Sequence, residues 1–141
     1  MILVAGATGV LGGEIARRLL ARGEKVRAMT RATSKPDTVD RLRKAGAEIV
    51  VADLKQPATL AAACKGVDAV ISSVTSVTTA QPGDSCEATD GQGTKSLIDA
   101  ARKAGVKRFV FVSFDADYSP DAPLARAGIL TSGLSATAFR K

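Results

Sequence analysis

The sequence of 141 residues contains no histidine, no tryptophan, two cysteines and one tyrosine. Without histidine, catalytic triads built on an imidazole and most zinc sites are excluded. Cys64 and Cys86 do not have the spacing of a metal site or of a redox pair, and Cys64 is expected to be a packing thiol within a helix. The chemistry of this chain must therefore depend on other residue types.

Aromatic residues make up only 4% of the chain, although its net charge is +6. A basic charge can attract nucleic acid, but proteins that bind single strands also need aromatic side chains on which bases stack. The basic residues are spread along the chain and are expected to be solvated. We therefore expect no nucleic-acid partner.

No apolar run approaches the about 20 residues of a membrane span, and the N-terminus shows no basic prefix of a signal peptide. The sequence thus predicts a cytoplasmic protein without a membrane partner. The chain has about the length of one domain, and its 45% hydrophobic content is sufficient for a core.

The first residues of the chain carry a glycine-rich motif, and the position of each glycine has a physical reason. A short apolar run at residues 1–5 leads into a turn with Gly6, Gly9 and Gly12 and then into an amphipathic helix. In a nucleotide-binding turn the first glycine permits the tight turn, the second lets a pyrophosphate approach the backbone, and the third allows close packing of helix and strand. Free N–H groups at the helix start favour the anion. The pattern predicts a dinucleotide site; the alternative is that the glycines serve only turn and packing.

The end of the expected second strand, residues 25–29, would lie at the adenosine ribose. An NAD site usually has Asp or Glu there, whereas an arginine suits the 2′-phosphate of NADP. This chain has Thr30 and Arg31, and Glu24 lies at the wrong end of the strand. We therefore expect NADPH to be preferred over NADH through Arg31, the alternative being an ordinary solvated arginine.

A pattern of helix, glycine and apolar strand then recurs. It predicts strands over 48–51, 69–72, 108–112 and 136–139, and helices over 36–45, 57–65 and about 87–104. Asp84, Glu87 and Asp90 are expected to start the last helix, where carboxylates complement the dipole. Strands that alternate with helices indicate a doubly wound parallel α/β sheet of the Rossmann type, with about six strands in the order 3-2-1-4-5-6.

Such sheets bind ligands beyond the carboxyl ends of their strands. Asp53 follows the third strand, where it can meet the adenine or cap a turn. Ser72, Ser73 and Val74 close the fourth strand, beside the expected nicotinamide ribose, unless the stretch after them is only a solvated loop.

Several of these segments resemble the NmrA-like family of atypical short-chain dehydrogenases/reductases: GATGVLG at 6–12, Thr30-Arg31, VADL at 51–54, VDAVISSV at 67–74 and DGQGTKSLIDAARKAGVKRFVFVS at 90–113. The resemblance implies NADP(H), used for reduction or for redox sensing. The cofactor-binding residues that it implies are Gly6, Thr8, Gly9, Val10, Leu11, Gly12, Arg31, Asp53, Leu54, Ser72, Ser73 and Val74.

The catalytic residues of the standard family members are not matched. Those enzymes use a Tyr-x-x-x-Lys pair, in which the lysine lowers the pKa of the tyrosine and holds the nicotinamide ribose. Here Tyr118 is followed four residues later by Ala122, and no lysine lies between Lys107 and Lys141. Tyr118 and Ser113, which follows the fifth strand, are the candidates that remain, and neither has the partner that this chemistry needs.

The family continues into a smaller domain that closes over the substrate, and we expect this chain to form a single cofactor-binding domain over residues 1–141 without that domain. The acidic run at 115–121 does not fit an EF-hand, so no metal is expected. Three functions stay open: an NADP(H) binder or redox sensor, an NADPH-dependent oxidoreductase of a small carbonyl or quinone-like substrate, and a structural or interaction domain, for example a homodimer.

Overall fold

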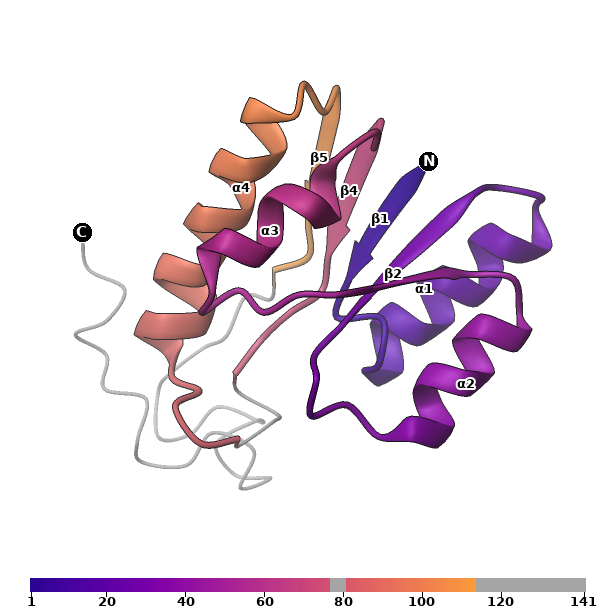
Figure 1. Ribbon diagram of the computed structural model, residues 1–141, viewed down its shortest axis with the longest axis horizontal. Coiled ribbons are helices and arrows are strands. Elements are labelled where there is room, and N and C mark those ends of the chain that lie inside the picture. Colours follow the sequence, from indigo (N-terminus) through magenta and orange to yellow (C-terminus); the bar gives the residue numbers. More distant parts are fainter. Residues whose placement is uncertain (77–80, 114–141) are drawn as a thin grey trace, which may run out of the picture.

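The structure, a computed structural model, describes residues 1–76 and 81–113 (Figure 1). Its strands are β1 (Ile2–Ala5), β2 (Val26–Thr30), β3 (Glu48–Val51), β4 (Ala69–Ser72) and β5 (Arg108–Phe111). They form one parallel sheet in the order β3-β2-β1-β4-β5. The predicted Rossmann-type α/β sheet is therefore confirmed for these strands. The expected sixth strand at 136–139 lies outside the described residues.

Helices cover both faces of this sheet. Figure 1 shows α1 (Val10–Ala21) and α2 (Pro36–Lys44) on one side, and α3 (Pro57–Cys64) and α4 (Thr94–Lys103) on the other. Successive side chains of a strand point to opposite faces, so Leu3 packs in the core beneath α3 and α4, and Val4 packs in the core beneath α1 and α2. This double burial explains the continuous apolar runs of the strands.

The helix starts follow local chemistry. Pro36 and Pro57 stand in the first turns of α2 and α3, where the missing N–H of proline removes no hydrogen bond. The observed ends lie within one residue of the predicted ends for these two helices, as does the end of β5. The second strand begins and ends one residue later than predicted.

The helix predicted at about 87–104 is observed over residues 86–103, but it consists of two parts of different type. A π-helix over Cys86–Gly93 precedes α4. It begins at Ser85, whose side chain accepts a hydrogen bond from the Ala88 N–H at 3.0 Å. Asp84 was expected to help start this helix, but its carboxylate points elsewhere, to two cations, which bind a buried anion more strongly than a helix start does.

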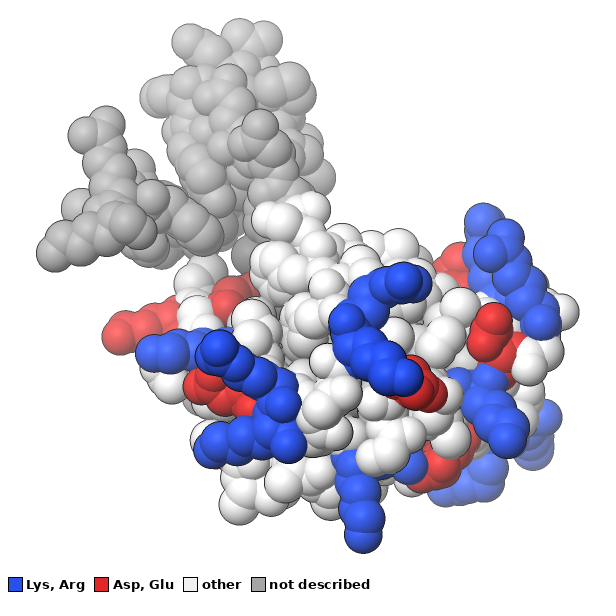
Figure 2. Space-filling model, turned by 90° about the horizontal axis from the view of Figure 1, so that it is seen from above, with Lys and Arg blue, Asp and Glu red and all other residues white. Residues whose placement is uncertain are grey.

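Charged side chains on the face seen in Figure 2 lie in separate places, with red acidic atoms beside the blue basic ones. Some of the charged side chains pair locally. Arg17 pairs with Glu14 and Arg43 with Asp40, each in an exposed ion pair within one helix. Within the described ranges, no helix is long and apolar enough to cross a membrane. No group of three or more potential metal ligands gathers in that part of the chain either; the acidic run at 115–121 lies outside it.

Candidate functional site

A cleft opens where β1, β2, β3 and β4 end, the edge at which ligands bind to parallel sheets. The strand ends that the sequence analysis selected therefore meet at one place. Residues that line the cleft include Gly6, Thr8, Gly9, Thr30, Arg31, Leu54, Ser73, Val74, Asp84 and Thr89.

The glycine turn forms one wall of this cleft. Gly6 has a φ of +83°, a conformation that favours glycine, and a Cβ there would lie 2.8 Å from Ser73 Oγ. At Gly12 a Cβ would lie only 2.2 Å from the carbonyl oxygen of Gly6. At Gly9 the nearest atom would be that same oxygen at 3.3 Å. Gly6 and Gly12 are thus required for packing, whereas the outer side of Gly9 is open.

Gly9 is also the N-cap of α1, and having no side chain it provides no capping group. The first N–H groups of a helix have no partner within the helix, so this end of α1 suits an anion. Val10 and Leu11 follow with 96% and 52% of their surface exposed. Neither residue lines the cleft, so the structure does not group these two predicted site residues with the others.

Arg31, after β2, meets an acidic partner in the cleft. Its Nη1 lies 2.9 Å from Asp84 Oδ2, and Lys55 Nζ lies 2.7 Å from Asp84 Oδ1. The Asp84 side chain is only 2% exposed. Burial alone raises the pKa of Asp84, but hydrogen bonds from Lys55 and Arg31, together with their charges, outweigh it and hold the pKa below its ordinary value.

Asp53 and Leu54 follow β3 as predicted. Asp53 Oδ1 accepts a hydrogen bond from the Lys55 N–H at 2.9 Å, and the Asp53 N–H donates to Thr59 Oγ1 at 3.1 Å. Asp53 therefore serves as a turn cap, one of its two expected roles, and a contact with adenine stays a prediction. Leu54 is buried and lines the cleft.

The residues after β4 divide between cleft and core. Ser73 and Val74 line the cleft, and Ser73 Oγ donates to the Ala5 carbonyl oxygen at 3.3 Å. Ser72 is fully buried, on the face of β4 that carries Val70. It does not reach the cleft surface, so the structure does not group it with the other predicted site residues.

Of the two catalytic candidates, only Ser113 lies among the described residues, and it is not brought to the cleft. Ser113 lies two residues beyond β5, is exposed, and is absent from the lining. Tyr118 lies outside the described residues.

Three residues were not predicted as site residues: Asp84 and Thr89 line the cleft, and Lys55 contacts Asp84. Thr89 is 5% exposed, lines the cleft, and its Oγ1 has no hydrogen-bond partner among the residues that the structure describes. An unpaired buried hydroxyl is costly, which favours a polar ligand at this place. The sequence does contain a signal that Asp84 has another role. Serine is a preferred N-cap residue, and if Ser85 caps the helix, Asp84 is not needed at the helix start.

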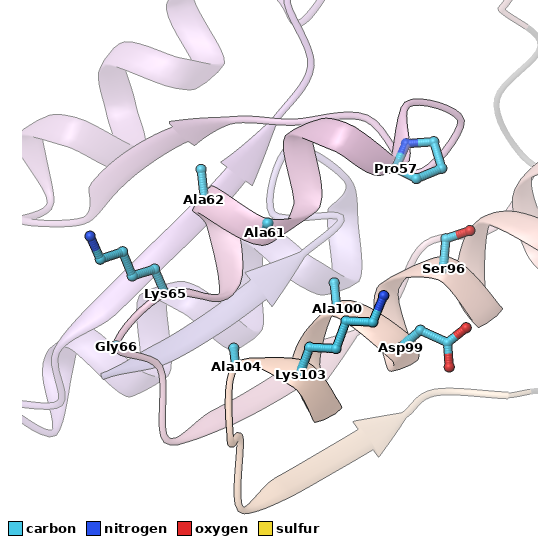
Figure 3. Close-up of a pocket in the computed structure, with 10 residues that line it drawn as sticks. All are labelled: Pro57, Ala61, Ala62, Lys65, Gly66, Ser96, Asp99, Ala100, Lys103 and Ala104. Atoms are coloured by element: carbon cyan, nitrogen blue, oxygen red, sulfur yellow. The ribbon is translucent and has the colours of Figure 1, made fainter.

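A larger hollow of about 630 Å³ lies between α3 and α4 (Figure 3). Four of its ten lining residues are alanines: Ala61, Ala62, Ala100 and Ala104. The charged side chains around it, Lys65 and Lys103 among them, are exposed. It offers no converging buried polar groups, so we assign ligand binding to the cleft at the strand ends.

The cleft suits a dinucleotide in three respects: an open glycine turn at a helix start, two cations near one end, and an unpaired buried hydroxyl in Thr89. The first two fit phosphate groups, and the third fits a polar group of the same molecule.

The chain is similar to curated proteins over most of its length. The chain is 36% identical over 146 residues to the photosystem II assembly factor Ycf39 of Cyanophora paradoxa, covering 99% of this chain and 44% of that protein. It spans less than half the length of each of the first curated relatives that it matches.

Solved structures of similar fold include two with bound cofactor. One is a short-chain dehydrogenase/reductase superfamily protein of Agrobacterium tumefaciens with bound NAD, at 35% identity and a TM-score of 0.63 over 80% of this chain and 32% of that one. The other is the NADPH-dependent quinone oxidoreductase QOR2 of Escherichia coli complexed with NADPH, at 26% identity and a TM-score of 0.61 over 81% of this chain and 37% of that one. The model of the NmrA-like family matches residues 1–124, and the chain belongs to this NAD(P)-binding reductase family.

Proposed function

We propose that the chain binds NADP(H) in the cleft at the strand ends, as a cofactor binder or redox sensor. The observation that carries this proposal is the convergence of the open turn at Gly9 with Arg31 in one cleft. The similar solved structures that hold NAD or NADPH support it.

In this proposal, each part of the cleft contacts a defined part of the cofactor. The N–H groups at the start of α1 bind the pyrophosphate across Gly9, with Thr8, Val10 and Leu11 around it. Arg31 binds the 2′-phosphate, because a guanidinium offers several donors to one phosphate group. Asp53 and Leu54 contact the adenine, and Ser73 and Val74 lie along the nicotinamide ribose. When bound, the cofactor supplies hydride chemistry.

Thermal unfolding with NADPH, with NADH and without ligand tests the proposal. A ligand at 100 times its dissociation constant adds about 2.7 kcal/mol to the free energy of unfolding. We expect both cofactors to raise the midpoint, and NADPH to raise it more at equal concentration. Identical midpoints with and without either cofactor would show that the cleft is not a dinucleotide site.

A second candidate is an NADPH-dependent oxidoreductase of a small carbonyl or quinone-like substrate. The likeness to the quinone oxidoreductase favours it. The sequence has no Tyr-x-x-x-Lys pair, so we rank binding above turnover. The cytoplasmic location and the homodimer stay predictions, and sedimentation at several concentrations tests the second of them.

A further inference from the structure

Asp84 is the most deeply buried charged group of the candidate site. Its side chain is 2% exposed, against 27% for Arg31 and 24% for Lys55. Each of its two oxygens is within 3 Å of a cation: Oδ2 accepts from Arg31 Nη1 at 2.9 Å and Oδ1 from Lys55 Nζ at 2.7 Å. A carboxylate therefore already occupies the place where two cations would hold an external anion.

The segment that carries Asp84 is fastened across the adenosine side of the cleft. Gln81 Oε1 accepts a hydrogen bond from Thr33 Oγ1 at 2.8 Å, in the loop after β2. The Pro82 carbonyl oxygen accepts one from Lys55 Nζ at 3.2 Å, in the loop after β3. A turn closes the segment, with the Asp84 N–H donating to the Gln81 carbonyl oxygen at 2.9 Å. Residues 81–84, which follow β4 in sequence, thus lie against the loops after β2 and β3.

We propose that Asp84 determines cofactor choice as an internal competitor of the 2′-phosphate: its carboxylate holds Arg31 in the cofactor-free chain, so NADPH must displace it while NADH need not. This inference rests on the proposed NADP(H) site. It reduces the preference for NADPH that Arg31 alone would give.

The electrostatic argument has two steps. A 2′-phosphate carries about 1.5 to 2 negative charges near pH 7. If it binds Arg31 beside the carboxylate, two anions face each other in a partly buried site, and this like-charge contact weakens binding. If it displaces the carboxylate, the hydrogen bonds to Arg31 and Lys55 are broken first. NADH carries a neutral 2′-hydroxyl and meets neither cost.

The test compares Asp84→Asn with the unchanged chain by calorimetric titration of NADPH and NADH. We expect the dissociation constant of NADPH to fall at least about tenfold and that of NADH to stay within about threefold. Titration with 2′,5′-ADP and with 5′-AMP assigns the effect to the 2′-phosphate, and only the first should bind more tightly. Asp40→Asn is the matched control, because it makes the same charge change in an exposed pair with Arg43 and should alter neither constant.

Lys55→Gln is a second variant, and it tests the inference even if Asp84→Asn does not fold. It leaves the Asp84 carboxylate to Arg31 alone and removes one cation, so NADPH should bind at least about threefold more weakly and NADH unchanged. An unchanged ratio of the two constants in Asp84→Asn, or weaker NADH binding, overturns the inference; the second result would make Asp84 an acceptor for the ribose hydroxyls. If neither cofactor binds to any of the chains, the proposed function is wrong and the inference falls with it.

Discussion

At the scale of single residues, two anions compete for Arg31. In the structure it pairs with Asp84, and in the proposed complex it contacts the 2′-phosphate. An arginine-phosphate hydrogen bond contributes about 1.5–3 kcal/mol, which corresponds to about tenfold to hundredfold in affinity. The pairing with Asp84 offsets a part of this gain.

Replacement of Arg31 tests its role directly. In Arg31→Ala we expect the affinity for NADPH to fall about tenfold, the lower end of that range because Asp84 already engages this arginine, while NADH changes little. Isothermal titration with both cofactors measures this. Arg43→Ala, which removes an exposed arginine of α2, is the control and should leave both affinities unchanged. Equal titration curves for the two cofactors with the unchanged chain would contradict the assigned role.

The same carboxylate makes stability depend on pH. Because the pKa of Asp84 is lower in the folded chain than its ordinary value, its ion pairs contribute stability above that value and lose it as the pH falls through the folded-state pKa. Asp84→Asn should therefore cost about 1–3 kcal/mol at pH 7, and less below about pH 4. Urea unfolding at pH 7 and at pH 3 measures the difference, with Asp40→Asn as control. A constant difference across this range would argue against the ion pairs.

At the scale of elements, the turn between β1 and α1 separates binding from folding. A side chain at Gly12 would collide with the backbone at 2.2 Å, whereas one at Gly9 would meet only an oxygen at 3.3 Å. Gly9 has φ −81° and ψ 170°, which valine also adopts readily. Two glycines of one motif should thus respond differently to substitution.

In Gly9→Val we expect the helical circular dichroism to persist and NADPH binding to disappear, because two methyl groups then stand where the pyrophosphate must approach. In Gly12→Ala the melting temperature should fall sharply, since the added Cβ has no room beside Gly6. Circular dichroism melting and NADPH titration of both variants are the measurements. Unchanged NADPH affinity in Gly9→Val would refute the placement of the phosphates.

The elements also show what a sequence can predict. The strands follow from apolar runs and glycine-ended helices, which are local signals, and their order follows from the Rossmann type of fold; the structure confirms both for β1 to β5. The long helix was predicted to within one residue at each end, whereas its first part is a π-helix and its cap is Ser85 and not Asp84. The pairing of Asp84 with Lys55, 29 positions away, and with Arg31, 53 positions away, depends on how three loops meet. No periodicity records such a contact.

At the scale of the whole molecule, the described residues form a sheet covered on both faces, with the cleft at one edge. β5 is an outer strand of this sheet, and Val110 and Phe111 are 42% and 47% exposed there. The cleft itself is built from the ends of β1 to β4 and from the segment after β4. Among the described residues, the polar groups that line it include neither a tyrosine nor a histidine.

The chain of residues 1–141 should therefore bind NADPH without turning over carbonyl, quinone or enone substrates. A positioned general acid contributes about 10² to 10⁴ in rate, and Tyr118 has Ala122 where the assisting lysine would stand. Ser113 is exposed and lies outside the cleft, and an unassisted hydroxyl is a poor proton donor. The absorbance of NADPH is followed with a panel of such acceptors, and Gly9→Val serves as the control for oxidation that does not involve the cleft. Substrate-dependent oxidation at about 1 s⁻¹ or faster, within the ordinary range of enzymes and absent in the control, would show that the chain is an oxidoreductase.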